Sequence, residues 1–192
     1  MIRCNPSGDY PKIDKTAYID PTAVIIGQVN IGKNVFVGPG AVIRADEIES
    51  SISISDGSNI QDRVIIHALG NSSVIIGRNT SLSHGCIVHG PCKIGNGCFI
   101  GFGSVIFKAN IKDNVFIKSL VVIEGVKISD KKFIPNGAIV SSPKAVELLR
   151  SISKEEIVFA MRVIKANLWL AKGYRLENRG LVSDSHSHKK EG

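Results

Sequence analysis

The chain has 192 residues, of which 43% are hydrophobic and 21% charged, with a net charge of +7. This length fits one domain with an accessory segment, and no hydrophobic run is long enough to span a membrane. The N-terminus lacks the apolar stretch of a secretory signal, so we expect a cytoplasmic protein. Aromatic residues make up only 6% and do not interleave with the basic residues, so we expect neither a nucleic-acid nor a membrane partner.

A hydrophobic repeat of six residues dominates residues 1–142. Aliphatic side chains recur at every sixth position, often followed by Gly, with two insertions and two slips of one residue. This period is the sequence signature of a parallel β-helix, an all-β solenoid of short strands. Three hexapeptides form one coil, so the run predicts about seven coils. The repeated aliphatics run through Ile13–Ile43, Ile54–Ile66, Ile76–Ile106, Ile111–Ile123 and Ile128–Val140.

The repeat predicts two columns of polar residues, because positions three hexapeptides apart stack about 4.8 Å from one another. Arg44, His67 and His89 each follow a repeated aliphatic and form one column. Asp62 and His84 form a second column on a different face. His67 and His89 can therefore share a metal ion that His84 of the same chain cannot easily reach. In a homotrimer, the second column of a neighbour could face the first. Three unrelated surface histidines are the alternative interpretation.

The insertions leave the solenoid just after Arg44 and His67, at residues 47–53 and 69–73. Loops beside a candidate site often carry function, although tolerated bulges would look the same in the sequence. The cysteines at positions 86, 92 and 98 are six residues apart, so they occupy equivalent corners of three faces. We expect them to be buried core residues without disulfides, which agrees with a reducing cytosol.

Residues 143–180 form the accessory segment, in which two helices are expected. Pro143 ends the repeats, and residues 145–150 predict a short helix. Ser153 and Glu156 form a capping box for a second helix, which should end near Lys172 with Gly173 as the residue after it. The polar tail, residues 181–192, is expected to be disordered. An apolar stripe on the second helix should pack on the solenoid or on a neighbouring subunit; it consists of Ile157, Met161, Ile164, Leu168 and Ala171.

Nearly the whole chain resembles the γ-class carbonic anhydrases. The resemblance depends on the order and spacing of several pieces rather than on any one motif. It implies a left-handed parallel β-helix, a homotrimer and reversible hydration of CO2 to bicarbonate. The matching pieces are Arg44-Ala45-Asp46-Glu47, Asn59-Ile60-Gln61-Asp62, His67, His84 and His89, and in the C-terminal helix Asn167, Leu170-Ala171 and Gly173-Tyr174.

The resemblance also implies ligands for a metal ion. His67 and His89 of one subunit and His84 of its neighbour would hold the metal, in agreement with the two columns. Three neutral imidazoles leave an open position for water, which is the pattern of catalytic zinc, although Fe²⁺ and Co²⁺ suit the same ligands. Arg44 and Asp46 would form ion pairs across subunits.

The remaining catalytic roles come from the same resemblance. Gln61 would orient the nucleophile, and Asp62 could accept a hydrogen bond from Gln61. Glu47 is the one matched acidic candidate for the proton shuttle, and Asn59 and Asn167 would line the site.

Two departures from the family keep other functions open. The acidic loop that follows the first histidine in active members is reduced here to residues 68–71, and Lys165 replaces a tyrosine of the helix. A weakly active or non-catalytic metal-binding protein is therefore one alternative. A hexapeptide-repeat acyltransferase, which would use a histidine base and bind a pantetheine arm between subunits, is another.

Overall fold

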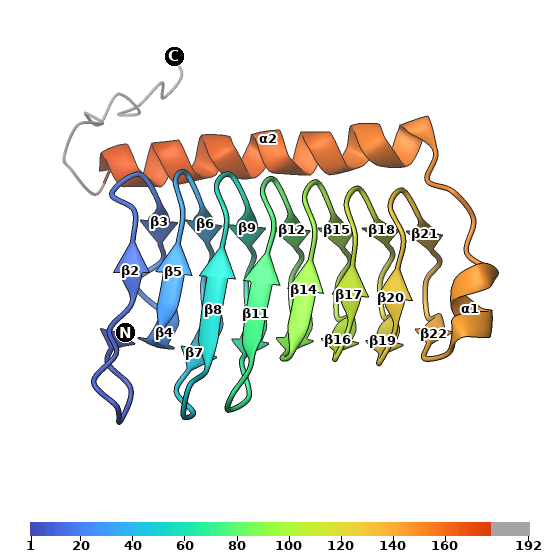
Figure 1. Cartoon of the computed structure of the whole chain (residues 1–192). Coiled ribbons are helices and arrows are strands. Elements are labelled where there is room, and N and C mark those ends of the chain that lie inside the picture. Colours follow the sequence, from blue (N-terminus) through green and yellow to red (C-terminus); the bar gives the residue numbers. More distant parts are fainter. Residues whose placement is uncertain (178–192) are drawn as a thin grey trace, which may run out of the picture.

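The structure, a computed structural model, describes residues 1–177 as a left-handed parallel β-helix with a C-terminal helix along one side (Figure 1). Each coil contributes one short strand to each of three parallel sheets. This architecture and the count of about seven coils confirm the prediction from the hexapeptide period. The three sheets are named face A, face B and face C below.

Face A contains β1 (Ile2–Arg3), β4 (Val24–Gly27), β7 (Val42–Ala45), β10 (Ile65–His67), β13 (Ile87–His89), β16 (Val105–Phe107), β19 (Val122–Glu124) and β22 (Ile139–Val140). Face B contains β2 (Lys12–Ile13), β5 (Val29–Ile31), β8 (Ser51–Ile54), β11 (Ser73–Ile76), β14 (Cys92–Ile94), β17 (Asn110–Ile111) and β20 (Lys127–Ile128). Face C contains β3 (Tyr18–Ile19), β6 (Phe36–Val37), β9 (Asn59–Ile60), β12 (Ser81–Leu82), β15 (Phe99–Ile100), β18 (Phe116–Ile117) and β21 (Phe133–Ile134).

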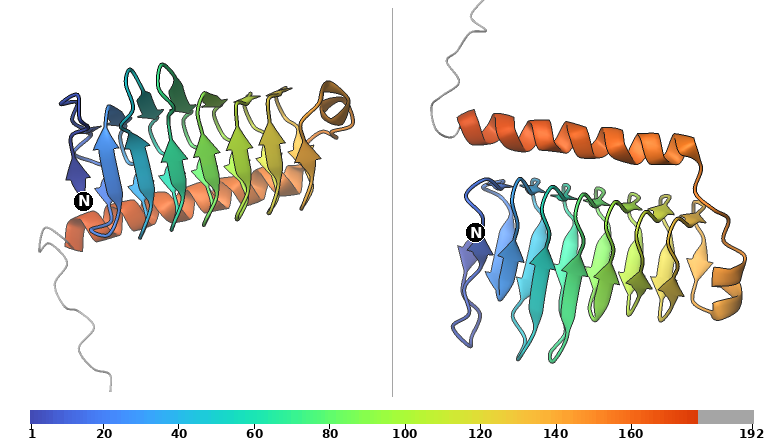
Figure 2. Two further views of the ribbon diagram at one scale, coloured as in Figure 1. Left: turned by 90° about the horizontal axis from the view of Figure 1, so that it is seen from below. Right: turned by 45° about the horizontal axis from the view of Figure 1, so that its top comes forward.

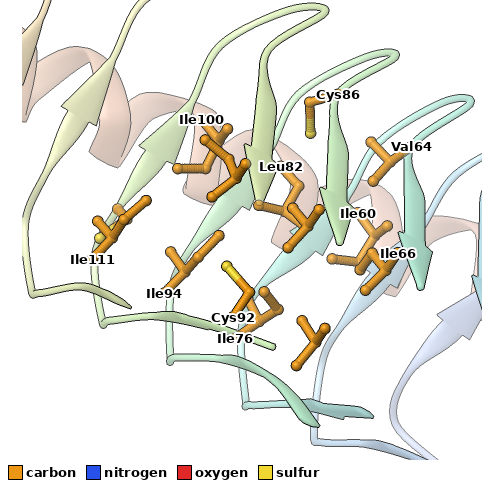
Figure 3. Packing of buried hydrophobic residues seen from close by; sticks show 14 of the residues in the cluster. Ile60, Val64, Ile66, Ile76, Leu82, Cys86, Cys92, Ile94, Ile100 and Ile111 are labelled. Carbon is orange, nitrogen blue, oxygen red and sulfur yellow. The ribbon is translucent and has the colours of Figure 1, made fainter. Parts of the chain in front are cut away.

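The core is a narrow column of aliphatic side chains, because one repeated aliphatic of each hexapeptide points inward. Ile66, Leu82 and Ile100 are fully buried, and Figure 3 shows how such residues stack between coils. Cys86, Cys92 and Cys98 are free thiols buried in the same core, as predicted. Burial disfavours the thiolate and raises the pKa of Cys86 and Cys98 to about 12 and that of Cys92 to about 11.

The residue before each inward aliphatic points outward, and its chemistry differs from face to face. On face B this column is mostly polar and contains Lys12, Asn30, Ser53, Ile75, Lys93, Asn110 and Lys127. On face A every member is a β-branched aliphatic that is at least partly exposed: Val24, Val42, Ile65, Ile87, Val105, Val122 and Ile139. Face A is therefore an uncovered apolar surface in the single chain.

Face C carries an aromatic column with a polar gap in the middle. Its members are Tyr18, Phe36, Asn59, Ser81, Phe99, Phe116 and Phe133. Helix α2 (Lys154–Glu177) lies along this face over the length of the solenoid, as both views of Figure 2 show. Ala160 and Val163 pack on the phenylalanines, while Leu170 and Ala171 pack on Tyr18 and Phe36.

The second helix begins as predicted, while the first helix and the end of the second differ from the prediction. Ser142 caps α1 (Pro143–Glu147), so this helix starts and ends earlier than the predicted 145–150. The capping box is confirmed: the backbone N–H of Ser153 donates to Glu156 Oε2 at 2.6 Å. However, α2 continues through Gly173 to Glu177. The ring of Tyr174 packs against Tyr18 of face C with centroids 5.1 Å apart, and this tertiary contact outweighs the helix-ending tendency of glycine.

The predicted apolar stripe of α2 divides between two environments. Ala171 is buried on face C, whereas Ile157 and Met161 are about half exposed and line a groove beside the helix. Within residues 1–177, neither helix has the length and apolar character needed to cross a bilayer. The expected disordered tail, residues 181–192, lies outside the described part of the chain.

Candidate metal centre

The first histidine column is confirmed by the strand register. β7, β10 and β13 pair in parallel so that Arg44 lies beside His67 and His67 lies beside His89. His67 Nδ1 and His89 Nε2 are 3.0 Å apart. Two nitrogens that bind one tetrahedral zinc ion, each at about 2.0–2.1 Å, would lie about 3.3 Å apart. The observed 3.0 Å is a hydrogen-bond distance between the two rings, and it is also close to the spacing that a shared metal ion requires.

The other ring nitrogen of His67, Nε2, has separate surroundings. His67 is only 17% exposed, and its Nε2 is a buried atom without a hydrogen-bond partner among the described residues. Nδ1 is the His67 nitrogen that faces His89, so Nε2 lies on the other side of the ring, toward Asp46 Oδ1 and Glu47 Oε1. Buried polar atoms are normally paired, so an unpaired Nε2 next to these carboxylates calls for a partner there. The donors present, two imidazoles with carboxylates nearby, are those that zinc and related divalent metals accept.

The first insertion loop brings acidic residues to this histidine pair. Arg44 Nε donates to Asp46 Oδ2 of the same chain at 3.0 Å, and the pairing of these residues across subunits stays a prediction. Asp46 Oδ1 and Glu47 Oε1 lie 3.4 and 3.5 Å from His67 Nε2. The backbone N–H of Gly70, in the second loop, donates to Glu47 Oε2 at 2.7 Å. The two insertions, visible as extended turns in Figure 1, thus hold each other beside His67.

The second column lies at the corner between face C and face A. The backbone N–H of Gly85 donates to the carbonyl of Asp62, which stacks the corner containing His84 directly on the corner containing Asp62. Asp62 Oδ2 lies 3.4 Å from His84 Nδ1, and the side chain of His84 is 55% exposed. Its ring stacks on Phe102 with centroids 5.6 Å apart.

The two columns border opposite edges of face A. His84 and His89 are five positions apart on mostly extended chain, so about 15 Å separates them. Within residues 1–177, no group of three or more histidine, cysteine, aspartate or glutamate side chains converges on one point. The single chain therefore presents two separate parts of a site rather than a complete one.

A polar network fills the gap in the aromatic column of face C. Asn59 Nδ2 donates to Ser81 Oγ at 2.8 Å, and Gln61 Nε2 donates to Asn59 Oδ1 at 2.9 Å. The prediction had Asp62 as the hydrogen-bond acceptor of Gln61, whereas the structure has Asn59 in that place. Asn167 of α2 lies opposite this gap. A cavity of about 360 Å³ opens here beside His84; its lining includes Tyr18, Asp20, Gln61, Asp62, Asn167 and Tyr174.

Sequence reasoning missed three residues at these sites. Ser81 completes the network of Asn59, and Phe102 and Phe107 contact His84 and His89 from the next coil. The column rule that selects the histidines also places these residues, because Phe102 and Phe107 lie 18 positions after the two histidines and Ser81 lies beside Asn59 in the strand register. Phenylalanine is neither polar nor a metal ligand, so its chemistry alone does not mark it as a site residue.

Comparisons with known proteins agree with this fold. A model described as bacterial transferase hexapeptide (six repeats) matches residues 10–45 and 73–108. The carbonic anhydrase of Methanosarcina thermophila is 36% identical, and the alignment covers 89% of this chain and 77% of that protein. The mitochondrial gamma carbonic anhydrase 2 of Arabidopsis thaliana is 32% identical over 88% of this chain and 60% of its own length. The chain belongs to the γ-carbonic anhydrase family.

The chain is also similar to proteins that have other names. The carboxysome assembly protein CcmM of Nostoc is 35% identical, and the alignment covers 85% of this chain but 31% of that protein. A solved structure of a hexapeptide transferase family protein from Anaplasma phagocytophilum has a TM-score of 0.77 and 27% identity, covering 91% of this chain and 98% of that one. A putative acetyltransferase from Bacillus cereus has a TM-score of 0.66 and 26% identity, with coverage of 91% and 96%. Membership therefore establishes the architecture, while the activity has to be argued from the site.

Proposed function

We propose that this chain catalyses the reversible hydration of CO2 to bicarbonate, with a divalent metal held between the subunits of a homotrimer. One observation carries the proposal: the three histidines are divided between the two edges of a single uncovered aliphatic face. His67 and His89 border one edge of face A, and His84 borders the other.

Face A is the surface best suited to contact another subunit. Face C is covered by α2, and the outward column of face B is mostly polar, whereas face A presents seven aliphatic side chains in a row. Most oligomers of one chain have closed symmetry, and three faces A can surround a threefold axis that runs along the solenoids. Each contact then brings one edge of face A toward the opposite edge of its neighbour. Rotation about such an axis preserves height, so His84, which shares a coil with His89, approaches the neighbour's histidine pair.

The residues of the chain have separate tasks in this proposal. The three imidazoles would hold Zn²⁺, or Fe²⁺ or Co²⁺, and such a metal supplies an activated water near neutral pH. Gln61 is tethered by its Nε2 to Asn59, which leaves its amide oxygen to accept a hydrogen bond from the attacking water. Glu47 is about half exposed beside His67, so its carboxylate can accept a proton and pass it to solvent.

Two alternatives have specific observations in their favour. The loop after His67 is short, and its Gly70 N–H group binds the Glu47 carboxylate, which favours a weakly active or non-catalytic metal-binding protein. Solved structures that resemble this fold include proteins named as transferases, which favours an acyltransferase. Both alternatives keep the trimer, so the chemistry must be tested separately from the assembly.

A subunit-mixing experiment tests the divided site directly. His67→Ala and His84→Ala homotrimers should each bind little metal and hydrate CO2 poorly, because every site lacks one ligand. Unfolding and refolding a 1:1 mixture should restore one complete site in each mixed trimer, which amounts to about a quarter of wild-type activity. Mass, metal content and stopped-flow CO2 hydration would be measured on protein purified without oxygen.

Several outcomes would contradict the proposal. No recovery on mixing, despite mixed trimers, would refute a site shared between subunits. Full metal occupancy in wild-type trimers without CO2 hydration would favour the non-catalytic alternative. Transfer of an acetyl group from acetyl-CoA that depends on a histidine would favour the acyltransferase.

A further inference from the structure

The environment of His84 is unusual for a proposed metal ligand, because so little of the protein touches it. The side chain lies at a solenoid corner and is 55% exposed. Its ring lies beside two side chains: Asp62, with Oδ2 at 3.4 Å from Nδ1, and Phe102. By contrast, His67 and His89 restrain each other and are supported by neighbouring coils on both sides.

Phe102 constrains the plane of the His84 ring. Their centroids are 5.6 Å apart and their planes differ by only 14°, which is a stacked arrangement. The N–H group of Gly103 donates to the His84 carbonyl at 3.1 Å, so the backbone holds the two rings one coil apart. Phe107 meets His89 edge-on, at 81°, and therefore does not align that ring in the same way.

Asp62 and Phe102 restrict different motions of the same imidazole. The carboxylate selects which nitrogen faces the corner, since it lies beside Nδ1. The phenyl ring limits rotation of the imidazole out of its plane. Nε2 lies on the opposite side of the ring and forms no hydrogen bond with any residue in the range 1–177. A ligand that must reach across to another subunit benefits from such preorientation, because less conformational freedom is lost on binding.

We propose that Phe102 is a positioning residue for the metal site: its ring holds the His84 imidazole in the orientation that a neighbouring subunit's histidine pair requires. This inference rests on the proposed function, and it adds a residue that is itself neither a ligand nor polar.

The test compares three variants for their affinity for Co²⁺, measured by competition with a chelator. Phe102→Leu keeps an apolar side chain but removes the stack, and should weaken Co²⁺ binding about two- to tenfold. Phe102→Tyr keeps the ring and should bind as the wild type does. Tyr10→Leu removes an aromatic ring that is 59% exposed elsewhere and should change nothing. The visible spectrum of bound Co²⁺ should change in Phe102→Leu alone, because it reports the ligand geometry.

Trimer stability is measured on the same samples by dilution. Weaker Co²⁺ binding by Phe102→Leu at a concentration where it remains trimeric supports the inference. Unchanged affinity and spectrum, or a loss that only follows trimer dissociation, would overturn it while leaving the proposed function intact. A wild-type trimer that binds no metal would instead refute the proposed function, and the positioning role with it.

Discussion

The assembly through face A can be tested with one substitution and a close control. Ile65 and Ile75 are both outward-facing isoleucines in neighbouring strands of one coil, with exposures of 41% and 38%. They differ in their faces: Ile65 lies in the aliphatic column of face A, whereas Ile75 lies between Ser53 and Lys93 on face B. Replacing each by glutamine makes the same chemical change on a surface expected to be buried and on one expected to face solvent.

The size of the effect follows from the exposure. Fully burying an isoleucine contributes about 1.5–3 kcal/mol, so covering the remaining 41% of Ile65 contributes about 0.6–1.2 kcal/mol per subunit. A glutamine amide buried without a partner costs a further 1–3 kcal/mol or so. Over three subunits, Ile65→Gln should weaken the trimer by about 5–13 kcal/mol, which is at least a thousandfold in the assembly constant.

The assay is sedimentation equilibrium over a dilution series, with metal content measured on the same samples. Ile65→Gln should dissociate at concentrations where the wild type and Ile75→Gln remain trimeric, and it should lose metal as it dissociates because the site is divided. Equal dissociation of the two variants, or greater dissociation of Ile75→Gln, would refute the assignment of face A as the contact surface. Circular dichroism would verify that both variants keep the β-helix.

Three further predictions concern the site and the core. Arg44→Ala should slow CO2 hydration, and should weaken the trimer if Arg44 also pairs with Asp46 of a neighbour; within one chain the pair is 45% and 21% exposed and contributes only about 0–1 kcal/mol, so unchanged dissociation on dilution would count against a pairing across subunits. Glu47→Ala should retain its metal but hydrate CO2 more slowly at low buffer, and imidazole should restore part of the rate; full activity at low buffer would mean that another group moves the proton. At pH 8, a thiol reagent should modify the exposed Cys4 in the native protein and the three core cysteines only after unfolding, because burial raises the pKa of those thiols; reaction of all four in the native state would show that the core opens.

Much of the architecture follows from local patterns in the sequence. The period of six specifies which side chains point inward, because every coil must bury an aliphatic in the same narrow core. The same arithmetic puts Arg44, His67 and His89 in one column, since the strand register can repeat only in whole coils. The start of α2 at Ser153 was likewise readable, because a capping box depends on residues three positions apart.

Other features depend on contacts between distant segments, so a periodic pattern does not contain them. Whether α2 ends at Gly173 depends on Tyr174 meeting Tyr18, far away in the sequence. The choice of Asn59 rather than Asp62 as the partner of Gln61 depends on side-chain directions at a corner. Equally, the pairing of Arg44 with Asp46 of the same chain depends on the path of an insertion loop.

The sequence by itself determined the β-helix, its buried aliphatics and the two histidine columns, because a strict repeat leaves the backbone a single register. Only the tertiary structure decided which of the three faces stays uncovered. The three faces are nearly equivalent in their inward residues, so these residues do not distinguish a covered face from an uncovered one. The faces become different because α2 folds back onto the aromatic column of face C and leaves the aliphatic column of face A exposed. That choice is what puts the two histidine columns on the borders of one open apolar surface.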